Sequence, residues 1–530
     1  MAKFLSIKDY SEIFNKLRAV KNGKELDVFK RRISKQFGAP LISNFQLLKV
    51  YHKSLKAKSA KRDKNIENLL KMRPIRSMSG VVNISVLTKE YPCPGKCLYC
   101  PKEKGIPKSY LSGEPAVERA KMLKFSPYRQ TKERIESLEM EGHEPEKIEA
   151  RIVGGTWSYY PKNYQIQFIK KIYDAANDRT GKNLTAAQKS NETAKHRIVA
   201  LSVETRPDYI NEDEIICLRN FGVTKVELGV QSIYNDVLDF VMRGHTAEKT
   251  VEASRLLKDA GFKLSYQMML NLPKSSAERD FEMFEQIFGN ADFKPDYLKI
   301  YPLALLREAP LYHLYKNNRF KIYSEDELID LIRKIKKITP YWTRIERVIR
   351  DIPAHKIFEG GVKTSNLRQV IHDQADGLNA ICRCIRCREI KAKYNPDEKF
   401  HLFRQDYEAS SGREIFLSFE SKDREKLASF LRLRIPSQYF NGQKYFLKVL
   451  QNSAVIREIK SVGVLTPVGQ IKRAPQHKGF GRKLLETAEN IVRKEFTLEK
   501  IAAIAAIGAR QYFRKNGYKL KDTYMVKDLG

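Results

Sequence analysis

Three cysteines share one short segment, residues 93–100, which reads CPGKCLYC. Their C-x3-C-x2-C spacing allows Cys93, Cys97 and Cys100 to hold three irons of a 4Fe-4S cluster, which leaves the fourth iron without a protein ligand. An iron with a free position can chelate S-adenosylmethionine and deliver an electron to its sulfonium, releasing a 5′-deoxyadenosyl radical. The alternatives are a zinc loop or three unrelated cysteines. Zinc needs a fourth ligand, and no His or Cys lies between Cys100 and His143. The spacing therefore favours radical chemistry.

A second group of cysteines follows much later, with C-x-C-x2-C spacing that excludes another radical motif. Three thiolates and one more distant ligand suit structural zinc, whose binding free energy would order a linker between domains. His355 and His372 are candidate fourth ligands, and three structural cysteines without metal remain the alternative. Arginines on either side of the group offer a further contact to RNA. The thiols are Cys382, Cys384 and Cys387.

Cysteine usage and hydropathy indicate a reducing compartment. Six of the seven cysteines fall in these two groups, which is typical of metal ligation rather than of a disulfide framework. The remaining one, Cys217, is expected to be a buried thiol. No apolar run approaches the roughly 18 residues of a membrane span, and Lys3, Lys8 and Lys16 interrupt the N-terminal apolar residues. We therefore expect a cytoplasmic protein with no membrane partner.

Net charge indicates a polyanionic partner. The chain has 98 basic and 63 acidic residues, a formal net charge of +35. A charge-rich thermophile surface is the alternative, but that style adds Glu together with Lys. Nucleic acid is the better interpretation. Residues 1–75 are expected to form a basic helical region, since apolar residues recur at helical spacing between lysine and arginine runs such as residues 53–64.

The middle of the chain alternates strands and helices. Such alternation predicts a parallel sheet, and six repeats predict a partial (β/α)6 barrel whose chemistry gathers at the C-terminal strand ends. The expected strands are residues 80–88, 148–153, 198–203, 223–230, 264–270 and 297–301, and the first leads into the cysteine segment.

Polar and glycine residues follow several of these strands. Gly154 and Gly155, before Thr156, would let backbone come close to the methionine part of a cofactor, although a Gly-Gly turn without a ligand is common. Glu204 and the segment containing Gln231 end the next two strands and suit ribose and adenine contacts. In register with the cysteine segment, these residues predict an S-adenosylmethionine site.

The C-terminal region has the order of an acetyltransferase of the GNAT type. Strands are expected at residues 414–419, 445–450, 454–460 and 501–506. Between the last two, Gln476, Gly479 and Gly481 form the Q-x-x-G-x-G pattern of an acetyl-CoA pyrophosphate loop before an amphipathic helix. Backbone N–H groups at a helix N-terminus face phosphates there, and the glycines permit close approach.

The succession of motifs resembles the catalytic subunit of the Elongator complex, Elongator complex protein 3, in its free-standing archaeal form. The resemblance runs from about Met72 to the C-terminus. It rests on both cysteine groups, the GNAT-type loop and the segments at residues 203–208, 227–232, 243–245 and 298–302. It implies an α/β multidomain fold with a basic helical tRNA-binding region at 1–75, a radical SAM domain at 76–370, a zinc-binding linker at 371–399 and a GNAT-type acetyl-CoA-binding domain at 400–530.

The resemblance also implies site residues. Lys299 and Tyr301 resemble residues that place or handle an acetyl group, and Lys147 matches a lysine that touches acetyl-CoA; a solvated surface charge is the alternative for either lysine. Further acetyl-CoA contacts are implied at Glu458, Ile459, Lys460, Ser461, Gln476, Gly479, Phe480, Gly481, Arg482, Tyr512 and Phe513. The chain departs from the family at Phe513 and Lys460, where a tyrosine and a histidine are usual, which puts the thioester-handling contacts in question.

The implied activity is formation of 5-carboxymethyluridine at the wobble position of tRNA, from acetyl-CoA by S-adenosylmethionine-dependent radical chemistry. The partners would be a tRNA anticodon stem-loop and an unidentified electron donor; nothing in the sequence requires further Elongator subunits. Two alternatives remain: a lysine acetyltransferase acting on basic histone-like tails, with a structural cluster, and a non-catalytic tRNA-binding scaffold. A chain of net charge +35 repels basic tails, and the intact cysteine segment argues against a scaffold.

Overall fold

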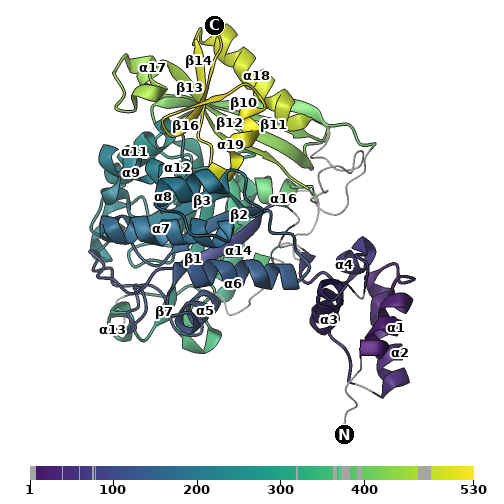
Figure 1. The fold of residues 1–530 in the computed structure, drawn as a ribbon. Coiled ribbons are helices and arrows are strands. Elements are labelled where there is room, and N and C mark those ends of the chain that lie inside the picture. The colour runs from purple at the N-terminus through teal and green to yellow at the C-terminus, as the bar shows by residue number, and fades with distance from the viewer. Residues whose placement is uncertain are drawn as a thin grey trace.

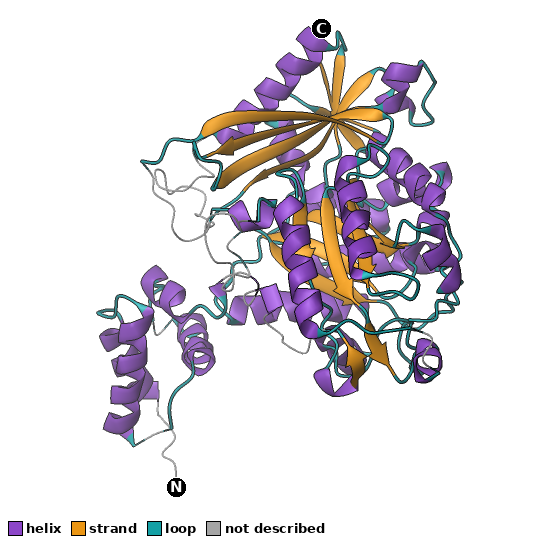
Figure 2. Cartoon of the chain, turned by 180° about the vertical axis from the view of Figure 1, so that it is seen from behind, coloured by secondary structure: helices purple, strands orange, loops and turns teal. Residues whose placement is uncertain are grey.

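The chain forms an N-terminal group of helices beside two stacked α/β units (Figure 1). The computed structural model describes residues 7–38, 40–58, 60–74, 77, 79–317, 320–361, 367–368, 371, 382–390, 397–463 and 479–530. Within these residues, no helix combines the length and apolarity that crossing a membrane requires. Seen from behind, the strands of the two units form separate layers (Figure 2).

The first α/β unit is a curved sheet of seven parallel strands, ordered β1-β2-β3-β4-β5-β6-β8. Six strands match the expected runs, so the prediction of a partial barrel is confirmed. The seventh, β8, was not predicted, because its short charged sequence Arg-Ile-Glu-Arg has no strand-like apolar pattern. The strands are β1 Val82–Leu87, β2 Lys147–Val153, β3 Arg197–Thr205, β4 Lys225–Gln231, β5 Lys263–Leu270, β6 Tyr297–Pro302 and β8 Arg344–Arg347.

The two faces of this sheet differ in polarity. Along β5, Leu264, Tyr266 and Met268 are fully buried in the main apolar core, whereas the alternating Lys263 and Gln267 point to the other, inner face. The inner face of the half-barrel is therefore polar, and the helices cover the apolar outer one. The helices of this unit are α5 Pro115–Met122, α6 Pro127–Met140, α7 Lys162–Asn177, α8 Leu184–Asn191, α9 Glu212–Asn220, α10 Asn235–Phe240, α11 Ala247–Asp259, α12 Ala277–Gly289, α13 Leu311–Lys316 and α14 Glu325–Ile338.

The second α/β unit is a mostly antiparallel sheet, ordered β10-β11-β12-β13-β14-β16-β15, in which only β13 and β14 pair in parallel. One expected strand, residues 445–450, is wrong: its apolar side chains instead fill the boundary with the half-barrel, where Tyr445 is buried and donates to the Leu256 carbonyl at 3.4 Å. The strands are β10 His401–Ala409, β11 Gly412–Glu420, β12 Leu427–Ile435, β13 Ser453–Ser461, β14 Lys500–Ala503, β15 Lys519–Lys521 and β16 Tyr524–Asp528, and the helices are α16 Ile385–Arg388, α17 Ser437–Asn441, α18 Phe480–Glu495 and α19 Arg510–Arg514. The small strands β7 Ala304–Leu306 and β9 Ile357–Gly360 pair apart from both sheets.

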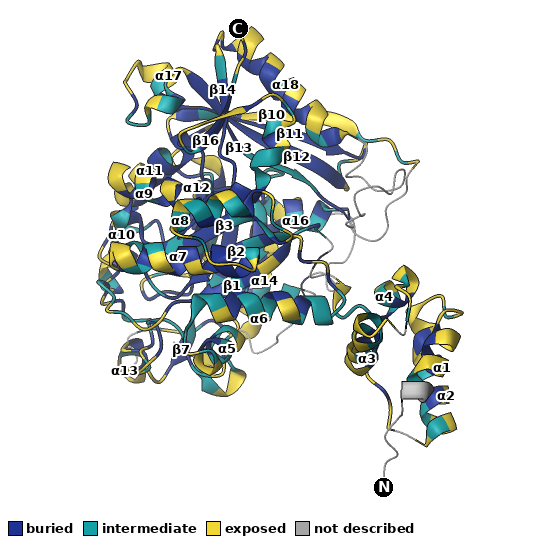
Figure 3. Cartoon of the chain, in the orientation of Figure 1, coloured by how far each residue is buried: buried dark blue, intermediate teal, exposed yellow. Residues whose placement is uncertain are grey.

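The N-terminal helices have a small core of their own, as the helical spacing predicted. Met72 N–H donates to the Glu141 carbonyl at 3.0 Å, and Arg62 pairs with Glu144 at 2.7 Å, which attaches this group to the end of α6. The outward faces are exposed (Figure 3), including Arg31, Arg32 and the lysines of residues 53–61. The helices are α1 Ile7–Leu17, α2 Gly23–Phe37, α3 Asn44–Lys56 and α4 Lys64–Leu70.

The two sheet units share one core and one set of buried ion pairs. Asp296, before β6, receives hydrogen bonds from Arg457 of β13 at 2.8 and 3.1 Å, and all these side-chain atoms are fully buried. Gly508 lies so close to β3 that a Cβ there would meet the Ile198 carbonyl oxygen at 2.9 Å. We infer that the second unit forms a fixed cover over the start of the half-barrel strands.

We expect Asp296→Ala to lower the free energy of unfolding by about 3–5 kcal/mol, because it leaves the buried Arg457 without its carboxylate. Urea unfolding followed by circular dichroism measures this. The matched control is Asp330→Ala, whose partner Lys334 lies 2.8 Å away with both side chains more than half exposed, and it should cost less than about 1 kcal/mol. Equal losses in the two variants would contradict a buried interdomain ion pair.

Candidate functional site

A cavity of about 230 Å³ opens at the C-terminal ends of the half-barrel strands, where the sequence predicted the chemistry. The three N-terminal cysteines line it together with glycine and polar residues from the following strand ends. We call it the cysteine cavity. Its lining includes Ser85, Cys93, Cys97, Cys100, Arg151, Val153, Gly155, Thr156, Glu204, Arg206, Gly229, Gln231, Arg243, Gln267, Met269, Lys299, Tyr301, Arg347 and Arg350.

Burial and neighbouring charges shift the pKa of two of these thiols, Cys97 and Cys100, in opposite directions. Burial disfavours the Cys97 thiolate, but the Arg243 guanidinium, whose Nη1 lies 3.5 Å from Sγ, outweighs burial and lowers the Cys97 pKa. Burial, reinforced by the charge of Cys97, raises the pKa of Cys100 to about 12. A cationic metal centre would reverse the second effect, since thiolates are the species that bind metal.

The cavity fits an iron–sulfur cluster with S-adenosylmethionine. Its three thiols do not form a group with every sulfur within 4.8 Å of the others, so they are too far apart for one ion and suit a larger inorganic core. Arg206 is 5% exposed, and its Nη1 has no hydrogen-bond partner among the described residues, which suits a ligand carboxylate. Gly155 has φ +85° and faces open space, so its missing side chain leaves room for a ligand.

Of the other residues predicted to bind S-adenosylmethionine, three line the cysteine cavity and one does not. Thr156, Glu204 and Gln231 line the cavity, as expected. Gly154 does not; it packs against Thr88, whose Oγ1 would lie 2.2 Å from an added Cβ. Glu204 accepts hydrogen bonds from Tyr110 at 3.0 Å and Gln267 at 3.1 Å, so its carboxylate is already held in place.

A second cavity, of about 660 Å³, lies between the start of the half-barrel strands and the C-terminal sheet unit. We call it the donor cleft. Eleven basic side chains and three acidic ones line it, an excess of positive charge that suits a polyphosphate ligand. The basic residues are Lys147, Arg151, Arg197, Lys225, Lys263, Arg344, Arg347, Arg386, Arg457, Lys460 and Arg482, and the acidic ones are Glu149, Glu346 and Glu458.

Helix α18 begins at the edge of this cleft. Gly479, with φ +72°, precedes its first turn, and no side chain caps that turn. The N–H groups of an uncapped helix N-terminus bind phosphate. A Cβ on Gly481 would lie 2.7 Å from the Tyr512 hydroxyl oxygen, so glycine keeps the cleft open here. These features fit coenzyme A; the predicted Gln476 lies outside the described residues.

Most residues predicted for acetyl-CoA line the donor cleft: Lys147, Glu458, Ile459, Lys460, Ser461, Gly479, Gly481, Arg482, Tyr512 and Phe513. Phe480 does not, because its ring stacks on Phe419 in the sheet core. Glu458 bonds to Tyr297 and, at 3.0 Å, to Arg432, so its carboxylate serves the interface between the units. Burial and then Arg197 lower the pKa of Lys147.

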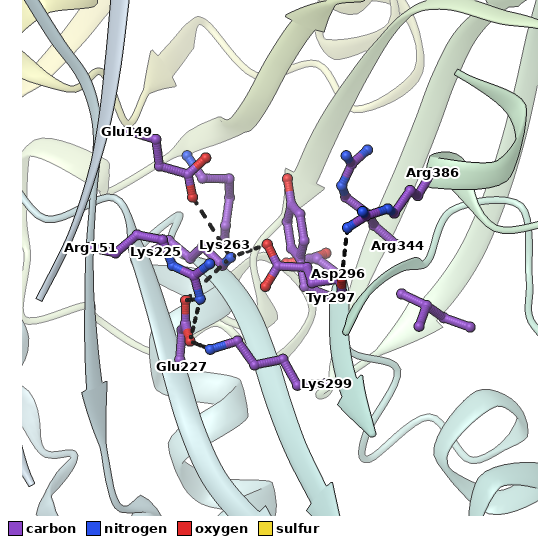
Figure 4. A network of polar contacts seen from close by, with 12 residues as sticks. Glu149, Arg151, Lys225, Glu227, Lys263, Asp296, Tyr297, Lys299, Arg344 and Arg386 are labelled. Carbon is purple, nitrogen blue, oxygen red and sulfur yellow. Dashed lines mark hydrogen bonds and ion pairs between the residues drawn. The ribbon is translucent and has the colours of Figure 1, made fainter. Parts of the chain in front are cut away.

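Between the two cavities, charged side chains cross the inside of the half-barrel (Figure 4). Glu227, which is 1% exposed, pairs with Lys299, with Arg151 at 3.0 Å and with Lys225 at 3.5 Å. Burial opposes ionisation of Glu227, but these cations outweigh it and lower its pKa. Lys299 is 2% exposed, so the alternative of a solvated surface lysine is wrong for this residue. Tyr301 lines the cysteine cavity from the next inward position of β6.

The second cysteine group is compact. The sulfurs of Cys382, Cys384 and Cys387 lie within 4.8 Å of one another. A tetrahedral zinc ion with bonds of about 2.3 Å needs sulfurs about 3.8 Å apart, which this arrangement fits. The described residues contribute no fourth ligand to this group, His355 included, and the other candidate, His372, lies outside them. Helix α16 starts within the group and lies against β8, where Ile385 N–H donates to the Thr343 carbonyl at 3.0 Å.

Several site residues were missed at the sequence level. Four polar residues lie on the inner face of the half-barrel: Arg151, Glu227, Gln267 and Arg347. Of these, the sequence pattern indicated only the segment that contains Glu227. One sequence feature could have identified them. Strands of a parallel sheet are usually apolar on both faces, but these strands have a charged or amide residue at every second position. Cys217, expected to be buried, is half-buried beside Lys162 at 3.5 Å.

Comparisons with known proteins agree on one family. The profile of the radical SAM superfamily matches residues 92–286, and that of the Radical_SAM C-terminal domain matches residues 295–376. The tRNA uridine(34) acetyltransferase of Methanocaldococcus jannaschii is 45% identical, with 87% of each chain covered. Its counterpart in Methanocaldococcus infernus is 43% identical over 97% of this chain and 98% of the relative. Human Elongator complex protein 3 is 38% identical, with 87% of this chain and 86% of the relative covered.

A solved structure supports the same relationship. The archaeal Methanocaldococcus infernus Elp3 with an N-terminal deletion of residues 1–46 superposes with a TM-score of 0.74 at 42% identity. The match covers 85% of this chain and all of that one. The similarity therefore includes both sheet units.

We expect Cys384→Ser to abolish zinc binding, which should be one ion per chain in the unchanged protein, because removing one of three clustered thiolates opens the site. Inductively coupled plasma mass spectrometry after purification measures the stoichiometry. Cys217→Ser is the control and should retain the zinc. Full zinc occupancy in the Cys384 variant would show that this group does not hold the ion.

We expect Glu227→Gln to lower the free energy of unfolding at pH 7 by about 3–5 kcal/mol, since it leaves buried cations uncompensated. The folded-state pKa of Glu227 is lowered, so its stabilising contribution is present above the unfolded pKa of about 4.3 and is lost as pH falls further. The gap between the two proteins in urea midpoint should therefore shrink below about pH 4.3. A gap that stays constant from pH 7 to pH 3.5 would mean that the charge of Glu227 contributes nothing.

Proposed function

The chain belongs to the Elongator complex protein 3 family, which includes the archaeal tRNA uridine(34) acetyltransferases, and from that premise we propose that it forms 5-carboxymethyluridine at the wobble uridine of tRNA. The acetyl group of acetyl-CoA would supply the two carbons. The carrying observation is that one half-barrel has a thiol-lined cavity at one end and a cationic cleft at the other, separated by a single layer of side chains.

The cysteine cavity supports the radical half of this activity. Cys93, Cys97 and Cys100 would hold a 4Fe-4S cluster, which together with S-adenosylmethionine would supply a 5′-deoxyadenosyl radical able to take hydrogen from an unactivated methyl group. Arg243 neutralises thiolate charge on one side, and the free nitrogen of Arg206 is available to a carboxylate. The radical SAM profile over residues 92–286 supports the same interpretation.

The donor cleft supports the acyl half. Uncapped N–H groups at the start of α18 would receive pyrophosphate, while Lys147 and Lys460 add positive charge near the half-barrel. Tyr512 would lie along the ligand, next to Gly481. Phe513 has no hydroxyl group. The hydroxyl of the adjacent Tyr512 would therefore be the only one that this pair of aromatic residues offers to the ligand.

Lys299 and Tyr301 would act where the two halves meet. Burial and Arg151 disfavour the Lys299 ammonium, but Glu227 and Glu204 raise its pKa above the ordinary value. Lys299 therefore stays protonated and can donate hydrogen bonds to an acyl or uracil oxygen, a role that a neutral amine would fill less well. The buried surroundings also exclude bulk water from the reacting groups.

The substrate class follows from the charge and from the family. The exposed basic faces of α1 to α4, within residues 1–75, would follow tRNA phosphates and deliver the anticodon to the half-barrel. The rest of the chain would divide into a radical SAM domain at 76–370, a zinc-binding linker at 371–399 and an acetyl-CoA-binding GNAT-type domain at 400–530. An external reductant would supply the electron.

We expect Cys97→Ala to abolish 5-carboxymethyluridine while leaving tRNA affinity within about two-fold, because the thiol holds the cluster and contacts no phosphate. Mass spectrometry of wobble nucleosides, after anaerobic reaction with reductant, S-adenosylmethionine and acetyl-CoA, measures the product. Filter binding measures tRNA affinity. Cys217→Ala should retain full activity, and modification surviving in the Cys97 variant would overturn the radical assignment.

A further inference from the structure

The inward side chains of the half-barrel form three layers. Because inward positions alternate along each strand, β4, β5 and β6 each present successive inward residues near the start, the middle and the end of the strand. Lys225, Lys263 and Tyr297 lie at the strand starts and line the donor cleft. Gly229, Gln267 and Tyr301 lie at the strand ends and line the cysteine cavity. The layer between them, which we call the middle layer, contains Arg151, Glu227, Ser265 and Lys299.

Along β4, β5 and β6, one inward residue of each strand lies between the residue that lines the donor cleft and the residue that lines the cysteine cavity: Glu227, Ser265 and Lys299. Arg151 lines both of them, and so does Arg347 of β8. Any group passing from the donor cleft to the three thiols along the inside of the half-barrel must therefore cross the level of Arg151, Glu227 and Lys299.

The middle layer is unlike the interior of a closed (β/α)8 barrel. There, layers of bulky branched side chains fill the centre. Here the centre holds ion pairs, and burying charges costs several kcal/mol per ion before pairing compensates it. Long lysine and arginine side chains can change partners by rotamer changes without moving the strands. A packed apolar layer of the same size could not open in this way.

Unpaired polar atoms in and next to the layer suggest what it accepts. Ser265 is fully buried, and its Oγ has no hydrogen-bond partner among the described residues. The same holds for Nε of Arg151 and for Oε2 of Glu346, which pairs through its other oxygen with Lys225 at 2.6 Å. A buried polar group left unpaired costs about 1–3 kcal/mol. The Ser265 hydroxyl and the Arg151 Nε–H are thus two donors that remain for an acceptor oxygen of an occupant, whereas Glu346 Oε2 is an acceptor that such an oxygen does not satisfy.

We propose that the middle layer is a binding passage for a two-carbon acyl group, through which the acetyl end of the donor reaches the cysteine cavity. Arg151 and Ser265 donate hydrogen bonds to the acyl oxygen, while Glu227 neutralises the three surrounding cations. This inference rests on the proposed function for the identity of the donor. It adds the route, its residues and the acyl oxygen as the group recognised.

The test places a thiol in the passage by the nearly isosteric substitution Ser265→Cys; we call the introduced group the passage thiol. The variant, with no iron–sulfur cluster assembled, is incubated anaerobically with bromoacetyl-CoA, whose reactive carbon occupies the acetyl methyl position. The thiolate form of the passage thiol attacks that carbon: a carbon–sulfur bond forms, the carbon–bromine bond breaks, bromide leaves and the thiol proton goes to solvent. Peptide mass spectrometry separates this adduct from any on the native cysteines, and no assembled cluster is needed.

The matched control is Ser254→Cys on α11, which introduces what we call the control thiol. Ser254 is also fully buried, but it bonds to the Thr250 carbonyl and lines neither cavity. We expect the passage thiol to react at least about 100-fold faster than the control thiol, because a bound reagent is held at a high effective concentration. Adding Arg151→Gln should slow labelling of the passage thiol about ten-fold at saturating reagent. Arg129→Gln, at an exposed position of α6 that lines neither cavity, should leave that saturated rate unchanged.

Bromoacetate distinguishes the two sources of a two-carbon acyl oxygen. Labelling of the passage thiol by bromoacetyl-CoA alone means that the intact thioester arm enters the passage. Labelling by bromoacetate faster than by neutral bromoacetamide means that the passage accepts the free acid. Either result supports the passage.

The proposal is overturned if every reagent labels the passage thiol no faster than the control thiol. This outcome counts when the variant still binds coenzyme A and melts like the parent protein. The result is independent of the activity assay, because 5-carboxymethyluridine formation could fail while the passage thiol is still labelled.

Discussion

Glu227 is surrounded by three cations in a space from which water is excluded, and both cavities depend on that arrangement. Without the carboxylate, Arg151, Lys225 and Lys299 would repel one another inside the half-barrel, and the strands carrying them would lose their polar contacts. With it, the inner face remains polar and spacious. The sheet can therefore present thiols at one end and a cleft lined by basic side chains at the other, while its outer face packs as an ordinary apolar core.

An open half-barrel needs a cover, and the second sheet unit provides it. Asp296, Arg432 and Arg457 join β6 to β12 and β13 through fully buried ion pairs, and the apolar core continues across the same boundary. β13 lines the donor cleft, and Arg457 of the same strand pairs with Asp296 across the boundary. The position of the cleft relative to the half-barrel is therefore set by packing. The three-thiol group beside β8 would further order the edge strand that carries Arg344, Glu346 and Arg347.

Much of this organisation was predictable because local signals were strong. The C-x3-C-x2-C segment, the six strand-like runs and the glycines at the start of α18 each have a short-range physical cause, and the structure has these elements. The four-residue strand β8 was not predictable, since its strand character comes from pairing with β6. The run at residues 445–450 looked like a strand for its apolar content, yet the same apolar side chains serve the boundary between the units. The ion pairs of the middle layer were also missed, because no local pattern says that Arg151 of β2 meets Glu227 of β4.

The central claim is that an acetyl methyl group meets a radical inside this half-barrel and then joins a tRNA base. Anaerobic reaction of the reconstituted protein with reductant, S-adenosylmethionine, tRNA and acetyl-CoA carrying three deuterium atoms on its methyl group tests it directly. The account predicts one deuterium in 5′-deoxyadenosine and two in the new C5 substituent of the wobble uridine, both read by mass spectrometry. Unlabelled 5′-deoxyadenosine together with a uridine product that keeps all three deuterium atoms would contradict it, because the acetyl group would then have been transferred without breaking a methyl carbon–hydrogen bond.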